Sequence, residues 1–305
     1  MRAAVLHGPE DLRVEEAPEP AGEVLVEVRA ATTCGTDVKM WRHGHRALGP
    51  YPCAFGHETA GVRADTDERV LVSDSVACGR CKPCRSGRPQ ICREPTWVLG
   101  GFAERIAAPA EALHPLPDGL SFAAAAMAEP LAAAVHAVSR GTDASDVGIL
   151  GAGPMGLMLC ALLVREGRSV TVADRHPERR QQADRLGGHG AEHLGRHPLV
   201  FEAVGRPEGW QAATAAAGPG GTVVLVGGCP PGTSVEFDPG RLHYDELELR
   251  GAFHHSREEV GEALRALTEI DLSPLLGETI ALEELPVALA HTGGRAIKWV
   301  VDPRA

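Results

Sequence analysis

The stretch that decides the fold is "VGILGAGPMG", residues 147–156. Its apolar first half reads as a buried strand, and its second half places Gly151, Gly153 and Gly156 in the spacing G-x-G-x-x-G. The first glycine permits a tight turn, the second lets a pyrophosphate approach the backbone, and the third allows a helix to pack closely on the strand. The stretch therefore predicts a dinucleotide-binding strand–turn–helix unit.

The next apolar segment, "SVTVAD", ends in Asp174, about 20 residues further on, where a carboxylate can bind the ribose hydroxyls of adenosine. The charge of Asp174 would repel the extra phosphate of NADP, so the sequence favours NAD. Arg175 leaves NADP or dual use open, because an arginine there can accommodate that phosphate. Arg179 could flank the adenine ribose. In the alternative interpretation, the glycines only pack a turn and no cofactor binds.

From about residue 146 onward, apolar strands alternate with amphipathic helices, which predicts a parallel sheet covered on both faces. Residues 1 to about 118 and the last 38 residues read instead as short strands and turns. The sequence thus predicts an α/β protein in which a doubly wound Rossmann domain, residues 123–265, interrupts a β-rich domain formed by residues 1–122 and 266–305.

The composition excludes several classes of function. Among the 305 residues, 41 are acidic and 30 basic, for a net charge of -11, which argues against nucleic-acid binding. It also gives no reason to expect attraction to an anionic membrane. No run approaches the ~18 apolar residues of a membrane span, and charged residues interrupt the first segment too early for a signal peptide. We expect a cytoplasmic protein.

Four of the eight cysteines lie in "CGRCKPCRSGRPQIC", residues 78–92. Clustered cysteines in a cytosolic protein indicate metal or redox chemistry. Cys78, Cys81, Cys84 and Cys92 could complete a closed tetrahedral zinc site. An iron–sulfur cluster is the main alternative, but the seven-residue gap before Cys92 fits a zinc lobe better. A closed site of this kind is scaffold and leaves catalysis to other residues.

A second constellation lies in "TTCGTDVK" and "AFGHETAG". Cys34, His57 and Glu58 offer sulfur, nitrogen and oxygen, and three protein ligands with an open fourth position are typical of catalytic zinc. Each residue has a structural alternative, since free cysteine is commonly just buried. In "SFAAAAMAEPLAAAVHAVSRG", Pro130 predicts a break between two helices, which places Glu129 at that break.

These segments resemble a known family. "CGTD", "GHETAG", the four-cysteine lobe, "EPLA" and "GAGPMG" occur in the order found in medium-chain, zinc-dependent alcohol dehydrogenases, and the likeness is greatest to the polyol branch, which includes sorbitol and threonine dehydrogenases. The resemblance implies a GroES-like catalytic domain with a structural zinc lobe, one catalytic and one structural Zn²⁺ per chain, NAD as cofactor, a small alcohol or carbonyl substrate, and a homodimer or homotetramer.

The resemblance also implies roles for individual residues. Cys34 and His57 would bind the catalytic zinc, with Glu58 as a third ligand or close acceptor. Glu129 would bind zinc directly or through water. Thr36 would take the alcohol proton, and Lys39 stands where many relatives carry a histidine that completes the proton relay. The implied cofactor contacts are Gly151, Gly153, Pro154, Met155, Gly156, Asp174, Arg175, Arg179, Val204 and Gly227.

The implied reaction is hydride transfer between NAD and a secondary alcohol of a polyol, sugar, cyclitol or amino alcohol, with zinc lowering the pKa of the hydroxyl. Two alternatives stay open. One is an NADPH-dependent carbonyl reductase, and the other is a catalytically silent dinucleotide-binding sensor or structural protein.

One segment departs from the family pattern. Between "AEHL" and "LVFEAVG" only "GRHP" remains, so the helix expected between the third and fourth Rossmann strands is missing. Parallel strands normally need a crossover of about a dozen residues or more. We therefore expect the third strand to be frayed, displaced or absent.

Overall fold

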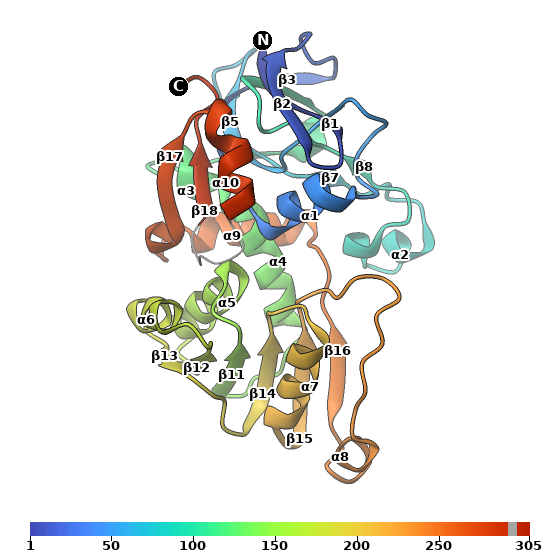
Figure 1. The fold of residues 1–305 in the computed structure, drawn as a ribbon, viewed down its shortest axis with the longest axis vertical. Coiled ribbons are helices and arrows are strands. Elements are labelled where there is room, and N and C mark those ends of the chain that lie inside the picture. The colour runs from blue at the N-terminus through green and yellow to red at the C-terminus, as the bar shows by residue number, and fades with distance from the viewer. Residues whose placement is uncertain (292–297) are drawn as a thin grey trace. The chain divides into compact units, whose positions relative to one another are not determined.

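The computed structural model describes residues 1–291 and 298–305 and divides into two compact units (Figure 1). Unit 1 consists of Met1–Ala132 and Ser256–Ala305, and unit 2 is the continuous segment Ala133–His255. Unit 2 is thus an insertion in the chain of unit 1, and both chain ends belong to unit 1. The α/β fold class predicted from the sequence is confirmed.

Unit 1 is rich in short strands. Its strands are β1 (Arg2–Gly8), β2 (Asp11–Glu16), β3 (Val24–Thr32), β4 (Cys53–Ala54), β5 (Glu58–Arg63), β6 (Arg69–Val72), β7 (Ser75–Val76), β8 (Thr96–Trp97), β9 (Arg105–Ala108), β10 (Leu113–Pro115), β17 (Leu276–Ile280) and β18 (Lys298–Val301). Its helices are α1 (Gly35–His43), α2 (Lys82–Arg85), α3 (Phe122–Ala126), α9 (Arg257–Ala266) and α10 (Leu285–His291), with 3₁₀ turns at Pro89–Ile91, Ala110–Ala112, Ser273–Leu275 and Leu282–Glu284. Helix α4 (Ala128–Ser139) begins in unit 1 and ends in unit 2.

The main sheet of unit 1 brings distant segments together. Its described strands follow the order β10-β6-β5-β3-β18-β17, and β9 also pairs with β3. The C-terminal strand β18 therefore lies beside β3, antiparallel to it, although more than 260 residues separate them. Two aliphatic and aromatic cores support the sheet, one of them built around the contacting rings of Phe55 and Phe102. This sheet fixes the end of β3, which Cys34 follows, and the start of β5, which His57 directly precedes.

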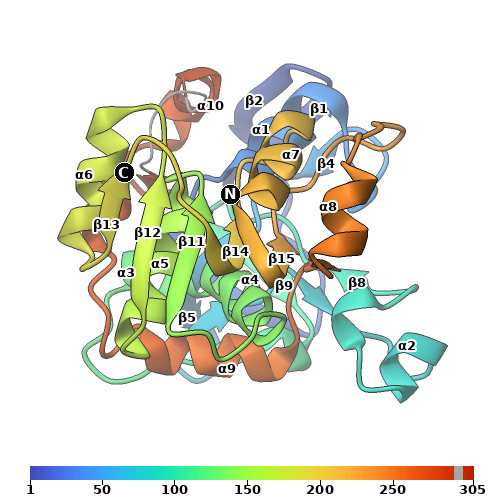
Figure 2. The same ribbon diagram turned by 90° about the horizontal axis from the view of Figure 1, so that it is seen from below.

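Unit 2 is a parallel sheet flanked by helices. Its strands are β11 (Asp146–Leu150), β12 (Ser169–Ala173), β13 (His189–Ala191), β14 (His197–Glu202), β15 (Ala217–Leu225) and β16 (Glu248–Gly251), and its helices are α5 (Pro154–Arg165), α6 (Pro177–Arg185), α7 (Pro207–Ala216) and α8 (Pro239–Tyr244). In residues 133–255, all of which are described, the strands lie in the order β13-β12-β11-β14-β15-β16 and every pairing is parallel (Figure 2). This is the 3-2-1-4-5-6 order of a dinucleotide-binding sheet, in which ligands bind at the carboxyl ends of the first and fourth strands.

The expected break in the helical segment is present. Helix α3 ends at Ala126, Met127 separates the two helices, and α4 begins at Ala128 with Pro130 in its first turn. The buried side chain of Glu129 therefore starts from the first turn of a helix, where a carboxylate is favoured by the helix dipole.

The shortened crossover does not abolish the third strand. Strand β13 is only three residues long but pairs in register with β12 at the sheet edge, so the expectation of a frayed, displaced or absent strand is wrong. The five-residue link 192–196 replaces a helix. Leu194 in this link packs on the core formed by Val200, Ala213 and Val223. A methyl group on Gly148 would lie 2.7 Å from the ring of His197, the first residue of β14, and 3.3 Å from Cδ1 of Leu194, so glycine there lets the link and the residue after it approach β11 closely.

No helix in residues 1–291 and 298–305 combines the length and the apolar character that crossing a membrane requires.

The close packing of the link gives a stability prediction. Leu194→Ala should lower the free energy of unfolding by about 1–3 kcal/mol, near the lower end for leucine truncation because Leu194 is only partly buried. Urea titration followed by circular dichroism measures this change. Arg196→Ala, an exposed position two residues away, is the matched control and should change stability by less than about 0.5 kcal/mol. Equal losses in the two variants would show that the link does not cover the sheet.

Candidate metal and dinucleotide sites

The four-cysteine lobe gathers its sulfurs at one point. Cys78, Cys81, Cys84 and Cys92 each offer a sulfur, and these atoms all lie within 4.8 Å of one another. Cys81 Sγ lies 3.4 Å from Cys84 Sγ and 3.8 Å from Cys92 Sγ, far longer than a disulfide bond. Four sulfurs around one Zn²⁺ at about 2.3 Å would stand about 3.8 Å apart. The donor set therefore fits a tetrahedral zinc ion.

The surroundings of the lobe shift the pKa values of its thiols in different directions. Backbone N–H groups of Arg93 and Cys84 lower the pKa of Cys81 to about 6. By contrast, loss of solvent and the neighbouring sulfurs raise the pKa of Cys84 to about 12. Without a cation the four thiols cannot all ionise near neutral pH. A bound divalent ion would deprotonate the remaining thiols, which is how thiolate sites couple metal binding to folding.

The second metal constellation lies at the start of α1. Cys34 is the N-cap of this helix, and its sulfur accepts a hydrogen bond from the backbone N–H of Thr36 at 3.1 Å. His57 Nε2 lies 3.3 Å from Cys34 Sγ. Sulfur and nitrogen ligands of one tetrahedral zinc stand about 3.5 Å apart. The two side chains, 23 positions apart in the chain, therefore point at a common position that suits a zinc ion.

Asp37 holds both ligands in place. One carboxylate oxygen, Oδ2, accepts the backbone N–H of Cys34 at 2.7 Å, and the other, Oδ1, lies 2.9 Å from His57 Nδ1. Burial alone would lower the pKa of His57, but the charges of Asp37 and Cys34 and the hydrogen bonds to them raise it well above its usual value. A carboxylate behind a histidine in this way orients the ring and leaves Nε2 for a metal.

The carboxylate of Glu58 binds Lys298 and Thr32. Its side chain is 0% exposed, and its Oε1 lies 2.8 Å from Lys298 Nζ, while Oε2 accepts a hydrogen bond from the hydroxyl of Thr32. The three residues belong to β5, β18 and β3, neighbouring strands of the main sheet. Both oxygens of Glu58 thus have partners within the protein, which favours the position of a nearby acceptor over that of a direct zinc ligand.

Burial disfavours the charged form of both Glu58 and Lys298, whereas the charge of each group favours the charged form of the other. The pKa of Glu58 is raised to about 7, because burial and the charges of Glu129 and Asp37 outweigh the opposing effect of Lys298 and His57. For Lys298, burial lowers the pKa, but Glu58 and the other acidic neighbours outweigh it and the net shift is upward. The 2.8 Å contact and the hydroxyl donor of Thr32 favour the charged pair.

Glu129 completes the cluster. An oxygen of Glu129, an oxygen of Glu58 and a nitrogen of His57 all lie within 4.8 Å of one another, and all three side chains are buried. Cys34, His57, Glu58 and Glu129 thus fall into two groups that share His57. Lys39 is exposed on α1, one helical turn beyond the first residue of that helix.

In unit 2, the glycines form an open cradle for a dinucleotide. Gly151 follows β11 with φ +101°, a conformation that other residues rarely adopt. A methyl group on Gly156 would lie 1.8 Å from the carbonyl oxygen of Gly151, so only glycine lets α5 start there. No atom of the described residues, 1–291 and 298–305, lies within 4 Å of such a methyl group on Gly153. The backbone at the start of α5 is therefore open to a phosphate, which the N–H groups that follow Pro154 in the first turn of α5 could bind.

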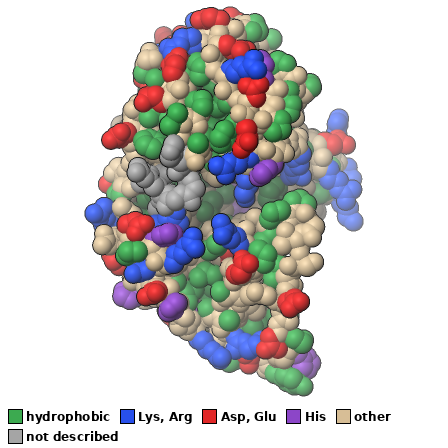
Figure 3. Space-filling view, viewed as in Figure 1, with side chains coloured by type: hydrophobic (Ala, Val, Ile, Leu, Met, Phe, Trp, Pro, Cys, Tyr) green, Lys and Arg blue, Asp and Glu red, His purple; other side chains and the backbone are tan. Residues whose placement is uncertain are grey.

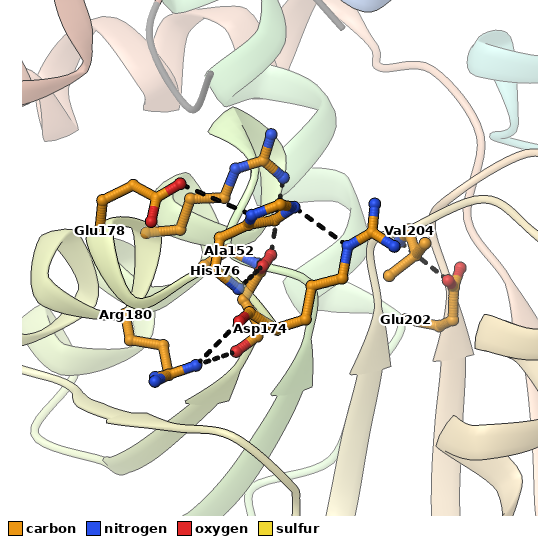
Figure 4. A network of polar contacts seen from close by, with 9 residues as sticks. Ala152, Asp174, His176, Glu178, Arg180, Glu202 and Val204 are labelled. Carbon is orange, nitrogen blue, oxygen red and sulfur yellow. Dashed lines mark hydrogen bonds and ion pairs between the residues drawn. The ribbon is translucent and has the colours of Figure 1, made fainter. Parts of the chain in front are cut away.

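Asp174 lies beside this turn (Figure 4). Its Oδ2 accepts the N–H of Ala152 and its Oδ1 accepts the N–H of His176, each at 2.9 Å. Arg179 Nη1 lies 3.7 Å from Oδ2, and Arg180 donates to the backbone oxygen of Asp174 at 2.9 Å. The carboxylate is thus fixed against the glycine turn, where it can still accept hydroxyl groups of a ribose.

The neighbouring strand contributes a second buried carboxylate. Glu202, the last residue of β14, accepts the N–H of Val204 at 2.8 Å through Oε1 (Figure 4). The same oxygen accepts the N–H of Gly205 at 2.9 Å. Burial raises its pKa. A methyl group on Gly227 would lie 2.7 Å from Glu202 Oε2. Glu202 therefore organises the two segments that carry the predicted cofactor contacts Val204 and Gly227.

Comparison with known proteins agrees with this geometry. Residues 20–118 match the alcohol dehydrogenase GroES-like domain, and residues 154–269 match the zinc-binding dehydrogenase domain. The chain is 30% identical to L-threonine 3-dehydrogenase of Rhizobium etli over 341 aligned positions, covering 99% of this chain and 98% of that one.

The chain belongs to the zinc-binding alcohol dehydrogenase family.

Two further relatives of this zinc-binding dehydrogenase are also dehydrogenases. Sorbitol dehydrogenase of Bacillus subtilis is 27% identical, over 95% of this chain and 92% of its own. The structure of a zinc-binding dehydrogenase candidate from Sinorhizobium meliloti 1021, bound to NADP, is 26% identical with a TM-score of 0.89 over 99% of both chains. The predicted membership of the medium-chain superfamily, in its polyol branch, and the prediction of a dehydrogenase are confirmed.

Sequence reasoning missed three residues of this dehydrogenase. Asp37 was contained in the quoted "CGTD", and its helical position after Cys34 was the signal for a cap. Glu202 follows a buried strand directly, which marks a residue at the carboxyl edge of the sheet. For Lys298 no local signal exists, because its partner Glu58 is 240 positions away.

Metal content tests the two constellations separately. We expect about two zinc ions per chain in the dehydrogenase purified without chelator, one for each tetrahedral donor set. Cys34→Ala should remove about one, because it deletes a ligand of the second set only. Elemental analysis measures this, with Cys160→Ala, a buried cysteine outside both sets, as the control. A Cys34→Ala protein with the zinc content of the wild type would exclude zinc at Cys34 and His57.

The buried ion pair gives a stability prediction. At pH 8, Lys298→Met should lower the free energy of unfolding by about 3–5 kcal/mol, because it leaves the carboxylate of Glu58 buried without its cation. Combining it with Glu58→Gln should restore part of that loss, since no buried charge remains. Urea unfolding of the wild type, both single variants and the double variant forms the thermodynamic cycle. Additive losses would show that the two groups do not interact.

Proposed function

We propose that this zinc-binding dehydrogenase transfers a hydride between NAD and a secondary alcohol of a polyol, sugar, cyclitol or amino alcohol. The observation that carries the proposal is the 3.3 Å approach of Cys34 Sγ and His57 Nε2, held by Asp37, in a chain of this family. Two ligands at this spacing, next to the carboxylate of Glu129, leave room for an exogenous ligand, as catalytic zinc sites do.

In this proposal each residue of the constellation has a distinct task. Cys34 and His57 bind the zinc, and Glu129 binds it directly or through water. Glu58, held by Lys298 and Thr32, contributes negative charge close to the metal without occupying a coordination position. The zinc, when bound, acts as a Lewis acid on the oxygen of the substrate. The same contact serves alcohol oxidation and carbonyl reduction.

Thr36 is the proposed acceptor of the alcohol proton. It lies in the first turn of α1 and its N–H already fixes the sulfur of Cys34, so its hydroxyl starts beside the metal ligands. We propose that this hydroxyl takes the proton of the alcohol and passes it outward. Lys39, exposed on the same helix, replaces the histidine that completes the relay in many relatives.

We propose NAD as the preferred cofactor, bound by unit 2. Gly151, Gly153, Pro154, Met155 and Gly156 form the phosphate cradle, Asp174 accepts the ribose hydroxyls, and Arg175, Arg179, Val204 and Gly227 line the remaining contacts. The charge of Asp174 disfavours a ribose 2′-phosphate. The positive charge of Arg175 favours the 2′-phosphate, and the 26% identical Sinorhizobium structure is bound to NADP. Kinetics with both cofactors therefore test the preference for NAD over NADP.

We also propose roles for the two units, a cellular location and an oligomeric state. The sequence predicts a catalytic domain at residues 1–122 and 266–305 and a dinucleotide-binding domain at 123–265. We propose that these domains are units 1 and 2, which divide at 132/133 and 255/256. We propose a cytoplasmic homodimer or homotetramer that binds neither nucleic acid nor membranes. An outer edge strand, β16, and the nearby Tyr244, which is 84% exposed, favour assembly with a second copy.

Absorbance of the reduced nicotinamide tests the activity. Zinc-loaded enzyme is incubated with NAD⁺ or NADP⁺ and a panel of polyols, sugars, cyclitols and amino alcohols, and the ketone products are offered with NADH or NADPH. Turnover that is lost in Cys34→Ala supports the proposal. Turnover only of carbonyl compounds with NADPH would favour the reductase. Zinc and dinucleotide binding without any turnover would favour the silent sensor.

Cofactor preference gives a separate prediction. Asp174→Ala should lower the ratio of kcat/KM for NAD⁺ to that for NADP⁺ by about tenfold or more, since removing the carboxylate removes both a ribose acceptor and a charge opposed to the 2′-phosphate. Arg175→Ala should raise the same ratio. Steady-state kinetics with one alcohol measures both. If Asp174→Ala lowers both values by one factor, Asp174 only shapes the turn.

A further inference from the structure

Two short loops of unit 2 meet at the carboxyl edge of its sheet. The first, residues 203–206, joins β14 to α7, and the second, residues 226–228, follows β15. A methyl group on Gly227 would lie 2.2 Å from the backbone nitrogen of Gly205, so the loops touch through their backbones at a pair of glycines. Gly205 has φ +72°, a conformation that glycine adopts readily. We call residues 203–206 and 226–228 the paired loops.

The first of the paired loops lies against the glycine turn that opens α5. A methyl group on Gly151 would lie 2.9 Å from Cγ2 of Val204 and 3.2 Å from the carbonyl carbon of Ala203. In a sheet of this strand order, a dinucleotide binds at the carboxyl ends of the first and fourth strands, which here are β11 and β14. The loop 203–206 therefore forms one wall of the expected cofactor site.

Val204 presents an apolar side chain at this wall. Apolar side chains are visible among charged ones on the face of unit 2 that Figure 3 shows, so exposure alone does not mark a binding residue. Val204 is distinguished by its place, because it is 45% exposed directly beside the glycine turn, while Phe201 and Glu202 before it are fully buried. Apolar side chains that line a site in this way pack on the rings of a ligand.

A buried carboxylate holds the first loop in place. Oε1 of Glu202 accepts the N–H groups of Val204 and Gly205, and a methyl group on Gly209 of α7 would lie 2.5 Å from the same oxygen. The other oxygen, Oε2, is buried and has no hydrogen-bond partner among the residues that the structure describes. A buried oxygen without a partner lowers stability. Stability therefore does not explain a carboxylate at this position, whereas fixing the loop of Val204 does.

Trp210 of α7 connects the two loops to each other. Its backbone N–H donates to the carbonyl oxygen of Arg206 in the first loop at 3.1 Å. Its indole Nε1 donates to the carbonyl oxygen of Gly227 in the second loop at 2.8 Å, across 17 positions of the chain. The backbone oxygen of Trp210 accepts the hydroxyl of Thr214 at 2.8 Å. One residue thus ties both paired loops to the same helix.

We propose that Trp210 is a positioning residue for the dinucleotide: its indole N–H holds Gly227 against Gly205 and so keeps the paired loops in the arrangement that binds the cofactor. The inference rests on the dinucleotide binding in the proposed function and adds a residue that acts through Gly227. Without this hydrogen bond, the second loop would have to be ordered when the cofactor binds, and the cost of ordering weakens binding.

Gln211, the next residue of α7, offers a matched control. Its Nε2 donates to the backbone oxygen of Glu236 at 3.0 Å, which is also a side-chain hydrogen bond from α7 to a later segment. Glu236 lies outside the paired loops. Trp210→Phe keeps an aromatic ring and removes the donor to Gly227, whereas Gln211→Met keeps the length of the side chain and removes the donor to Glu236.

Binding of NADH to the zinc-loaded enzyme, measured by titration calorimetry without an alcohol, tests the inference. NADPH takes its place if it binds more tightly to the wild type. Trp210→Phe should raise the dissociation constant by about fivefold, the factor expected for the loss of one hydrogen bond. Gln211→Met should change it by less than about twofold. An unchanged dissociation constant in Trp210→Phe, or an equal increase in both variants, overturns the inference.

Kinetics and stability separate positioning from a general loss of structure. Trp210→Phe should raise KM for NAD⁺ by about fivefold without lowering kcat or raising KM for the alcohol, because only cofactor binding depends on the paired loops. A fall in kcat and in zinc content together would show a damaged fold and contradict a positioning role. If Trp210→Phe does not fold by circular dichroism, β-(3-benzothienyl)alanine at position 210, which replaces only the N–H by sulfur, decides the question in the same titration.

The binding measurement also separates this inference from the proposed activity. If no alcohol or carbonyl compound is turned over, the proposed function fails, and the dissociation constants of the wild type, Trp210→Phe and Gln211→Met still decide the role of Trp210. Turnover with the same KM for NAD⁺ in the wild type and Trp210→Phe refutes the inference and leaves the proposed function standing. A wild type that binds neither NADH nor NADPH contradicts both.

Discussion

The buried pair of Glu58 and Lys298 is the contact on which the candidate active site depends. It joins β5 to the C-terminal strand β18, and the hydroxyl of Thr32 ties β3 to the same carboxylate. His57 precedes Glu58 directly, so the strand that anchors Glu58 also sets the position of a metal ligand. Two buried charges are costly unless they are paired and hydrogen-bonded, and this requirement holds the three strands in one register.

The parts of the molecule that the sequence predicted are those whose chemistry is local. The glycine turn after β11 and the four-cysteine lobe each lie within about fifteen residues, and spacing alone defines what they can bind. The helix break beside Glu129 follows from Pro130 in the same way. By contrast, the pairing of Glu58 with Lys298 and the contact of Asp37 with His57 depend on sheet register, which a single sequence does not reveal.

The shortened crossover shows how local spacing can also mislead. A link of five residues is too short for a helix, yet β13 still pairs with β12, because α6 delivers the chain to that edge before the link begins. The link then crosses the sheet with Leu194 against its core and with Gly148 leaving space for His197. The family pattern gave the expected length of the crossover, whereas the physical requirement is hydrophobic coverage of the sheet. Leu194 in the short link meets part of that requirement.

The two metal constellations differ in what surrounds their ligands, and this difference assigns their tasks. In the lobe, four sulfurs converge and backbone N–H groups favour the thiolates, so the donor set is complete without outside help. At Cys34 and His57, the carboxylate of Asp37 lies behind the ligands, and the oxygens of Glu58 and Glu129 lie beside His57. Because α1 starts beside these ligands and carries cations along its exposed face, the helix that positions the metal ligand also presents charge to whatever binds there. One short helix thus carries both the capping residue Cys34 and exposed cationic side chains.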